Sequence, residues 1–314
     1  MNKIGTKKER EKERKVLVKR LKTHWQLYLF LLPMLVYLFV FDYVPLYGIQ
    51  IAFRDFKPHL GILGSEWVGM KYFKQFFDSS MFSVILPNTL ILSLYSLLAG
   101  VIPPIVLAIC LNYIPSTRFK KLVQNITYAP HFISLVVIVS LIQVFFSTST
   151  GLVNNILESL GHEEVFFLGD PQTFRHIYVW SGVWQSVGWS SIIYLANLTN
   201  VNPELHEAAR VDGATIMQRI RYIDIPTIMP VIVTIFIMST GKLMSLGFDK
   251  AYLLQNNFNL ETSELISTYV YKRGLLHAQY SYSTAVGLFN SVINLILILL
   301  TNAISKKLTE TSVI

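Results

Sequence analysis

Cysteine and charged residues are both scarce in this chain of 314 residues. The one cysteine, Cys110, excludes an internal disulfide and a cysteine metal site, and its apolar neighbours indicate a small packed side chain. Only 15% of the residues are charged and 52% are hydrophobic, whereas charged residues make up about a quarter of a soluble globular domain. The composition therefore excludes an ordinary soluble domain and favours a membrane protein.

The sequence also lacks the groups of side chains that a membrane enzyme or an ion-coupled transporter needs. Its seven histidines are scattered, so no cluster of His, Asp and Glu indicates a metal pair or a nucleophile with its base. Asp42 is the one acidic residue within an apolar stretch, while secondary transporters usually carry paired carboxylates there. Gly241-Lys242 is not part of a phosphate-binding loop, because Phe236 stands at the first glycine position and Leu243 replaces Ser or Thr. We therefore expect no catalytic residue, no metal ligand and no cofactor in this chain, with a secondary transporter and a membrane enzyme as the rival hypotheses.

Long apolar stretches dominate what is present. A helix needs about 20 apolar residues to cross a bilayer core. Six stretches meet this requirement, at about 26–46, 86–111, 123–147, 177–199, 228–247 and 283–305. No A-x-A signal-peptidase site follows the first stretch, so we expect it to stay as a membrane anchor. The sequence therefore predicts an all-α membrane protein with six transmembrane helices, the first of them over 25–47.

Positive charge is distributed unevenly over the connections between these stretches. Of the 27 Lys and Arg, 18 belong to one set of alternate connections and 8 to the other, and ten precede Thr23. Positively charged loops stay in the cytoplasm, which puts both termini (1–24 and 306–314) there and the segment 48–83 outside. The net charge of +8 therefore needs no nucleic acid partner. We interpret the basic tail as a solvated arm that fixes orientation, although an amphipathic helix on anionic membrane lipid has the same composition.

The polar stretch 200–227 connects the fourth and fifth apolar stretches. Asn202-Pro203 predicts the start of a helix, since Asn caps free amides and proline loses no hydrogen bond at the first helical position. Gly213 predicts the end of that helix in a left-handed cap. Taken alone, this pattern is that of an ordinary cytoplasmic helical hairpin.

The residue spacing within this stretch is more specific than a hairpin requires. A Glu-Ala-Ala triplet is followed after three residues by Gly213, and after nine more by Ile-x-Ile-Pro. This pattern resembles the EAA loop of the permeases of binding-protein-dependent ABC importers, and Asp212-Gly213-Ala214 is similar to the carbohydrate branch of that family. The one departure is Ile225, where the family usually has leucine, a volume-conserving change. The resemblance implies a coupling helix that docks into a groove of a separate ATPase, and it implicates Glu207, Ala208, Ala209, Asp212, Gly213, Ile223 and Pro226.

The resemblance also implies an architecture and a set of partners. It implies the type I ABC importer permease fold, with the transmembrane domain over 84–305, in a multi-pass protein of the cell membrane. The implied partners are a second homologous permease subunit in a heterodimer, cytoplasmic ATPase subunits that hold ATP and Mg, and an extracellular solute-binding lipoprotein. ATP-driven closure of the ATPases moves the coupling helix and rocks the spans around a midplane sugar site. We expect a permease subunit, not itself an enzyme, that imports a carbohydrate such as an oligosaccharide; the alternative is a permease of the same class for a non-sugar solute.

The fourth apolar stretch is the least apolar of the six. Its polar and aromatic side chains are expected to face the bundle interior, because lipid cannot satisfy them. An indole face stacks on the C–H groups of a sugar while an amide bonds hydroxyls. Four residues of this stretch and one at the start of the second are candidates for the sugar path: Trp184, Gln185, Trp189, Asn197 and Asn88. Packing of small polar residues between helices predicts a similar composition, so both interpretations stay open.

Overall fold

The computed structural model describes residues 23–241, 243–245 and 247–309. Most of the predicted basic tail, Lys242 and the last residues of the expected cytoplasmic C-terminus lie outside these ranges. The chain separates into two compact units, Met1–Gly69 and Met70–Ile314, and each is described by itself. Helices dominate both units, which confirms the predicted helical class.

One long apolar helical run dominates the first unit. The α-helix α2 (Trp25–Leu38) continues through a π-helical turn (Phe39–Tyr43) into a 3-10 helix (Val44–Phe53). An 18-residue window of this run has a mean hydropathy of 2.0. The side chains of α2 are exposed, which a helix surrounded by lipid requires. The strand β1 (Arg54–Asp55) then pairs antiparallel with β2 (Glu66–Trp67) across the short helix α3 (Gly61–Gly64).

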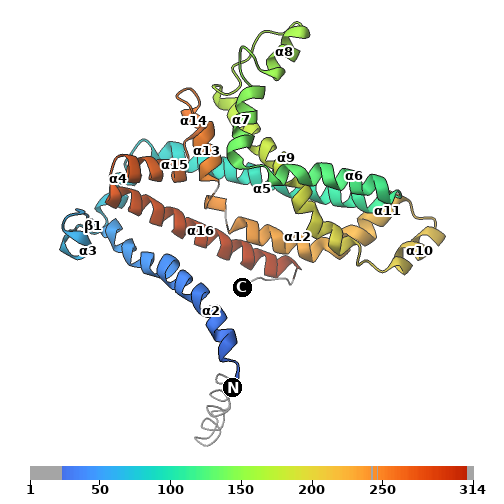
Figure 1. Cartoon of the computed structure of the whole chain (residues 1–314), viewed down its shortest axis with the longest axis horizontal. Helices are drawn as coiled ribbons and strands as arrows, with labels where there is room; N and C mark the ends of the chain where they lie inside the picture. The colour runs from blue at the N-terminus through green and yellow to red at the C-terminus, as the bar shows by residue number, and fades with distance from the viewer. Residues whose placement is uncertain (1–22, 242, 246, 310–314) are drawn as a thin grey trace, which may run out of the picture. The chain divides into compact units, whose positions relative to one another are not determined.

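Long helices form the frame of the second unit: α5 (Phe82–Tyr113), α9 (Pro171–Leu198), α12 (Ile225–Thr240) and α16 (Tyr280–Thr309). The helix α5 packs against α9, and α12 packs against α16 (Figure 1). The Asp170 carboxylate accepts hydrogen bonds from the backbone N–H groups of Gln172 and Thr173. This cap starts α9 six residues before the predicted apolar stretch, because an N-cap overrides hydropathy as a boundary signal.

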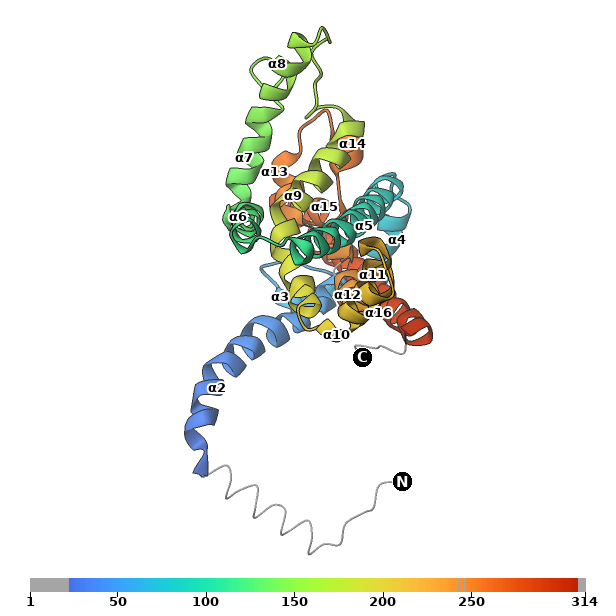
Figure 2. The same ribbon diagram turned by 90° about the vertical axis from the view of Figure 1, so that its right-hand side faces the viewer.

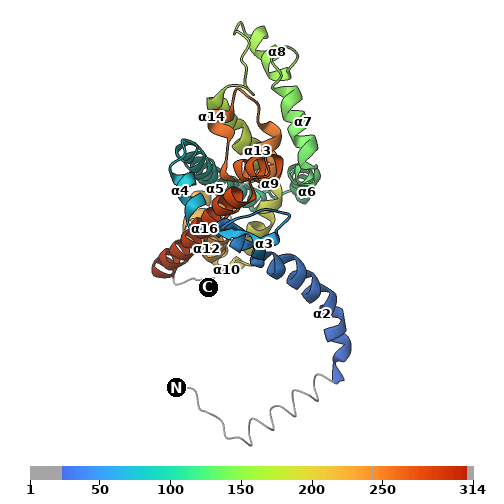
Figure 3. The same ribbon diagram turned by 90° about the vertical axis from the view of Figure 1, so that its left-hand side faces the viewer.

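Shorter elements cover the ends of this frame. They are α4 (Lys71–Phe77), α8 (Leu152–Ser159), α10 (Pro203–Val211), α11 (Ile216–Arg219), α13 (Phe248–Leu254), α14 (Leu260–Ser263) and α15 (Ile266–Tyr271). Figure 2 looks onto the end of the second unit that carries α10 and α11. Figure 3 looks onto the opposite end, with α4, α13 and α14.

Clusters of buried apolar side chains hold the helices of the second unit together. One joins α5, α9 and α13, and an aromatic one joins α4 to α16, where the ring centroids of Phe76 and Phe289 lie 5.5 Å apart. A further cluster contains Leu111, Leu198 and Ile228. It fixes the end of α5 and the end of α9 against the start of α12, so it anchors both ends of the 200–227 loop.

The apolar stretch predicted at 123–147 is not one continuous helix. The chain forms α6 (Thr117–Tyr128), a 3-10 turn (Ala129–Phe132) and α7 (Leu135–Phe145), and the two helical arms meet at 100°. Pro130 donates no backbone hydrogen bond, and the Ser134 hydroxyl starts α7 afresh by accepting from Val137 N–H. The bend therefore follows from local chemistry that an apolarity count does not register.

Fewer helices than predicted satisfy the criteria for a membrane span. Within the described residues four helices are long and apolar enough, or five if the bent pair α6–α7 is one span. The helix α9 is long enough at 28 residues, but its Trp, Gln, Ser and Asn side chains make it too polar to be recognised by composition. A sixth span therefore depends on α9 lying inside a bundle, where polar side chains can be satisfied.

Candidate functional site: the 200–227 loop and its neighbouring cavities

The helix α10 begins where the sequence predicts. The Asn202 side-chain oxygen accepts a hydrogen bond from Glu204 N–H at 3.0 Å, and Pro203 occupies the first helical position. Glu204 lies in the first turn, where a carboxylate interacts favourably with the positive end of the helix dipole. The predicted helix start is confirmed.

The helix α10 also ends as predicted, at Gly213. Gly213 has a φ of +77°, a conformation that glycine adopts without steric cost. Ala214 N–H donates to Ala209 C=O at 2.8 Å, and Gly213 N–H donates to Arg210 C=O at 3.1 Å. These two bonds form a Schellman motif, which satisfies the last carbonyls of the helix and sets the direction of the chain beyond it.

The residues expected to meet an ATPase lie on an accessible surface. Glu207, Ala208, Asp212, Gly213 and Pro226 are exposed, and Ala209 and Ile223 are half-buried. Large apolar side chains of the same loop are exposed beside them: Leu205, Val211, Ile216, Met217 and Tyr222. Val211 is 87% exposed. Exposed apolar side chains on an otherwise polar loop are typical of an interaction surface.

A buried polar cluster at the base of this loop was not predicted. The Tyr113 hydroxyl at the end of α5 donates to Asp224 Oδ2 at 2.7 Å, and His206 Nε2 on α10 lies 3.3 Å from Asp224 Oδ1. The Arg219 guanidinium lies over the Tyr113 ring, 5.6 Å from its centroid. Among the residues that the structure describes, no three His, Cys, Asp or Glu side chains come together to hold a metal ion. A carboxylate two residues before Pro226 is the one sequence signal that could have pointed to the cluster.

A cavity lined by hydroxyl groups lies between α5, α9 and α12. It has a volume of about 420 Å³, and its polar lining consists of Ser93, Ser96, Ser190, Tyr194 and Ser239. The hydroxyls of Ser93 and Ser96 are buried and have no hydrogen-bond partner within the described part of the chain. We call this space the serine cavity. Buried hydroxyls are nearly always bonded, so two unpaired ones in the wall of this cavity are unusual.

Asn88, a predicted sugar-path residue, is engaged within the protein. Its side-chain N–H₂ donates to the carbonyls of Glu261 and Glu264 at 2.7 and 3.3 Å, and its oxygen accepts from Arg175 at 2.9 Å. It is 4% exposed. These bonds tie α5 to α9 and to the segment around α14.

Gln185 and Trp189 contact the bend between α6 and α7. The Gln185 amide donates to Ile133 C=O at 3.1 Å. The Trp189 indole stacks on the His131 ring at a centroid distance of 4.5 Å. Asn197 bonds within its own helix, donating to Ile193 C=O at 2.8 Å. None of these residues is among the side chains that line the serine cavity in the described structure.

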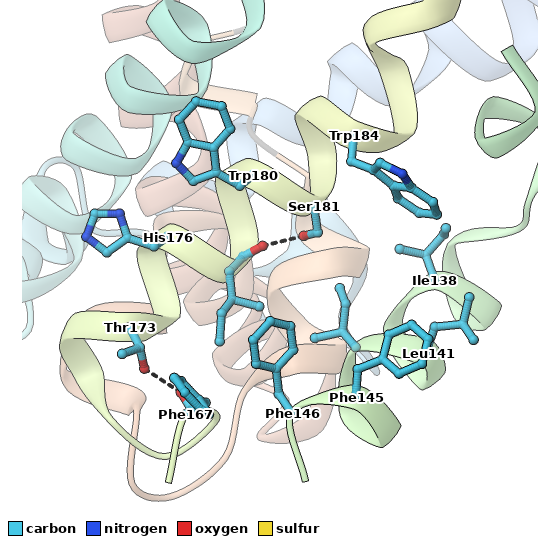
Figure 4. A pocket seen from close by; sticks show the side chains of 12 residues that line it. Ile138, Leu141, Phe145, Phe146, Phe167, Thr173, His176, Trp180, Ser181 and Trp184 are labelled. Carbon is cyan, nitrogen blue, oxygen red and sulfur yellow. Dashed lines mark hydrogen bonds between the residues drawn. The ribbon is translucent and has the colours of Figure 1, made fainter. Parts of the chain in front are cut away.

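Trp184 lines a different cavity, which is apolar. This cavity has a volume of about 510 Å³ and lies between α7 and α9. Figure 4 shows the Thr173 and Ser181 hydroxyls bonded to carbonyls of the chain rather than pointing into the space. The indole N–H of Trp180 donates to Tyr95 Oη at 2.8 Å. Because the Thr173 and Ser181 hydroxyls and the Trp180 indole N–H are bonded within the chain, this cavity offers few polar groups to the hydroxyls of a sugar.

One lysine of α13 is buried without an acidic partner in the described structure. Lys250 Nζ donates to Tyr178 C=O at 2.7 Å and lies 4.9 Å from the centroid of the Tyr178 ring. Burial lowers the pKa of Lys250 from 10.5 to about 8. Lys250 lies after the predicted apolar stretch 228–247 and before the next one at 283–305.

Comparison with known proteins identifies the family. The family model described as "Binding-protein-dependent transport system inner membrane component" matches residues 100–310. This chain belongs to that family. This inner membrane component is 44% identical over 302 residues to the polygalacturonan/rhamnogalacturonan transport system permease protein YteP of Bacillus subtilis, covering 96% of this chain and 94% of the relative. It is 42% identical over 281 residues to Protein LplB of the same organism, covering 90% and 88%.

A solved structure supports the same assignment. A chain of a bacterial ABC transporter involved in the import of the acidic polysaccharide alginate matches with a TM-score of 0.86 and 41% identity. The match covers 93% of this inner membrane component and 99% of that chain. A second structure of an alginate ABC transporter, in complex with a periplasmic protein that binds an alginate pentasaccharide, matches with the same TM-score and 40% identity. The resemblance inferred from the EAA spacing is therefore confirmed, as is the location in the membrane.

Proposed function

We propose that this inner membrane component is the permease subunit of an ATP-driven importer that moves an oligosaccharide into the cell by alternating access. The names of its relatives support a carbohydrate: a permease protein of a polygalacturonan/rhamnogalacturonan transport system and a chain of a transporter involved in the import of the acidic polysaccharide alginate match over nearly the whole chain. The serine cavity is the observation within this chain that carries the proposal. A buried hydroxyl without a partner costs about 1–3 kcal/mol, so a cavity that keeps two of them is suited to an occupant rich in hydroxyls.

The size and composition of the serine cavity agree with a short stretch of saccharide. Small-molecule sites commonly enclose about 300–1,000 Å³ and combine apolar walls with a few placed polar groups. The serine cavity has about 420 Å³, with Leu97, Val101 and Ile193 among its apolar walls. A non-sugar solute of similar size is the alternative, and it would leave the Ser93 and Ser96 hydroxyls less completely paired.

The proposed path also includes the residues expected from the sequence. Asn88, Trp184, Gln185, Trp189 and Asn197 form a second set, whose present contacts favour packing roles for Asn88 and Gln185. Both sets can contribute if the spans rearrange between inward-facing and outward-facing states. Substitutions in the two sets of residues should affect sugar uptake differently, so one uptake experiment can compare them.

The proposed topology has six spans and both termini in the cytoplasm. The polar helix α9 is the proposed fourth span, lying inside the bundle, and 48–83 is the proposed extracellular segment. In the proposed assembly, a second homologous permease completes a heterodimer, cytoplasmic ATPase subunits hydrolyse ATP, and a solute-binding lipoprotein delivers the sugar. The periplasmic binding protein bound to the alginate transporter supports the last of these partners.

We also propose that 200–227 is the coupling loop, with α10 docking into the ATPase. Its proposed contact residues are Glu207, Ala208, Ala209, Asp212, Gly213, Ile223 and Pro226. The Schellman cap at Gly213 and the accessible surface of α10 support this role. The small side chains of Ala208 and Ala209 allow close approach, and the exposed apolar residues of the loop supply area to bury.

The test replaces hydroxyls of the serine cavity in the assembled transporter. We expect Ser93→Ala with Ser96→Ala to reduce oligosaccharide uptake about tenfold, since two hydrogen bonds to the sugar are lost. Thermal stability should be unchanged or higher, because removing an unpaired buried hydroxyl costs the fold nothing. Ser140→Ala, whose hydroxyl bonds Val136 C=O on α7, is the control. Normal uptake by the double variant, together with lost uptake by Gln185→Ala or Trp189→Ala, would move the path to the second set.

A separate measurement identifies the sugar. Binding calorimetry on the cognate solute-binding protein, with neutral and uronic-acid oligosaccharides of increasing length, tests whether the ligand is a carbohydrate at all. Binding of a non-sugar solute alone would refute the proposed substrate class and leave the family assignment intact.

A further inference from the structure

One buried carboxylate joins several elements at the base of the coupling loop. Asp224 has no exposed surface, and it stands in the π-helical turn Ile220–Asp224 immediately before α12. Its two oxygens face different elements: Tyr113 at the end of α5 and His206 in the middle of α10. A single side chain therefore connects the coupling helix, the second predicted span and the beginning of the fifth.

Few other side chains hold α10 to the rest of the protein. The helix α10 has no buried residue, and His206 and Ala209 are its half-buried positions. On the side of α9 the chain passes through exposed residues 199–200 and 202, and on the side of α11 through exposed Asp212 and Gly213. The connection to α12 contains a π-helical turn, a form found frequently at functional sites. The His206–Asp224 contact is consequently a main side-chain link between α10 and the spans.

The chemistry of the contact between His206 and Asp224 makes its loss costly. A buried carboxylate is stable only where it is bonded or paired, and hydrogen bonds to an ionised group are roughly twice as strong as those between neutral groups. Arg219 is also buried, lies over the Tyr113 ring, and has an Nε with no partner within the described residues. If α10 moves, the Asp224 carboxylate must either follow it or lose the 3.3 Å contact of its Oδ1 with His206, and this buried oxygen has no hydrogen-bond partner among the described residues. Asp224 therefore favours movement of α10 together with α5 and α12 over sliding of α10 past these two helices.

We propose that Asp224 is a positioning residue that transmits the movement of α10 to α5 and α12 through its contact with His206 and the hydrogen bond that it accepts from Tyr113. The proposal rests on the coupling role proposed for α10. It assigns Asp224 no contact with the sugar or with ATP. Its effect is on the ratio of sugar moved to ATP hydrolysed.

The experiment measures that ratio in the complete transporter, with permeases, ATPases and binding protein, reconstituted in proteoliposomes. We expect Asp224→Asn to lower sugar uptake per ATP hydrolysed at least fivefold, because the side-chain amide keeps one oxygen for Tyr113 but replaces the oxygen that faces His206 by an uncharged N–H₂ group. His206→Leu should have a similar effect, whereas His206→Gln keeps an N–H donor and should restore much of the ratio. Asp78→Asn and His162→Gln, at exposed positions away from the loop, are the matched controls.

The outcomes separate this proposal from simpler ones. If uptake and ATP hydrolysis fall in parallel with the amount of assembled complex, Asp224 merely stabilises the fold and the proposal is refuted. If Asp224→Asn assembles poorly, the comparison of His206→Leu with His206→Gln decides the matter, since the His206 side chain is partly exposed. A normal ratio in His206→Leu refutes the proposal. Gly213→Val tests the coupling role of the 200–227 loop itself. If Gly213→Val uncouples transport while Asp224→Asn and His206→Leu do not, the proposed coupling role is supported and only the role proposed for Asp224 is refuted.

Discussion

Replacing Gly213 by valine tests the coupling loop at the point where its geometry is most specific. Gly213 has a φ of +77°, and a Cβ built on it meets no atom within 4 Å. A Cβ at this position therefore causes no clash, and the expected effect comes from the backbone conformation. A β-branched residue with positive φ costs about 1–3 kcal/mol. That cost shifts the loop away from the Schellman cap by about 5- to 150-fold.

The structure offers a matched control for this substitution. Gly161 follows α8 with a φ of +81° and no atom within 4 Å of a built Cβ. His162 N–H donates to Leu157 C=O and Gly161 N–H to Glu158 C=O, both at 2.9 Å, so the same cap is present. Gly161→Val therefore imposes the same strain on a helix end that no ATPase is proposed to contact.

The assay compares sugar uptake and ATP hydrolysis in proteoliposomes that contain the complete transporter. For Gly213→Val we expect normal membrane abundance, loss of uptake, and ATP hydrolysis that loaded binding protein no longer stimulates. Gly213→Asn should be milder than Gly213→Ala and Gly213→Val, because asparagine tolerates a left-handed conformation. The reasoning is refuted if Gly213→Val transports at the normal rate, or if Gly161→Val uncouples transport equally.

The remaining predictions concern energy supply, topology and the buried lysine. The purified subunit without partners should hydrolyse no ATP above a mock preparation, and measurable turnover would contradict the assignment of hydrolysis to partner subunits. In a variant with Cys110 replaced, an impermeant thiol reagent should label His59→Cys, an exposed position of the segment 48–83, but not Ser312→Cys in intact cells. The reverse pattern would overturn the proposed topology. Burial lowers the pKa of Lys250 from 10.5 to about 8 in the folded protein. The protonated lysine therefore destabilises the folded state, and this cost is lost between pH 8 and pH 10.5, where Lys250 is neutral in the folded protein but still charged in the unfolded chain. The melting temperature should therefore rise as the pH increases from 8 towards 10.5. The Lys250→Met variant should lack this rise in melting temperature and be more stable than the unchanged protein at pH 7. The control Lys272→Met should be less stable, because it breaks an ion pair of 2.6 Å with Glu264. A rise that persists in Lys250→Met would contradict the argument.

The sequence by itself determined those features that depend on short-range chemistry. The start of α10 at Asn202-Pro203 and its end at Gly213 follow from capping and from backbone freedom, and both are visible within a few residues. The apolar stretches similarly require a membrane, whatever the arrangement of the helices. The spacing from Glu207 to Pro226 was specific enough to indicate the family, which the comparisons confirm.

Tertiary structure decided which side chains meet. Asp224 is separated from Tyr113 by 111 residues, and no local pattern indicates that their side chains are bonded. The serine cavity likewise needs three helices packed at one depth before the Ser93 and Ser96 hydroxyls share a space with Ser239. The bend at Pro130–Ser134 was missed because an apolar run looks the same whether its helix is straight or broken. Local rules act over about one helical turn, whereas a buried bond or a cavity depends on the packing of segments that are distant in the chain, and packing is a property of the assembled fold.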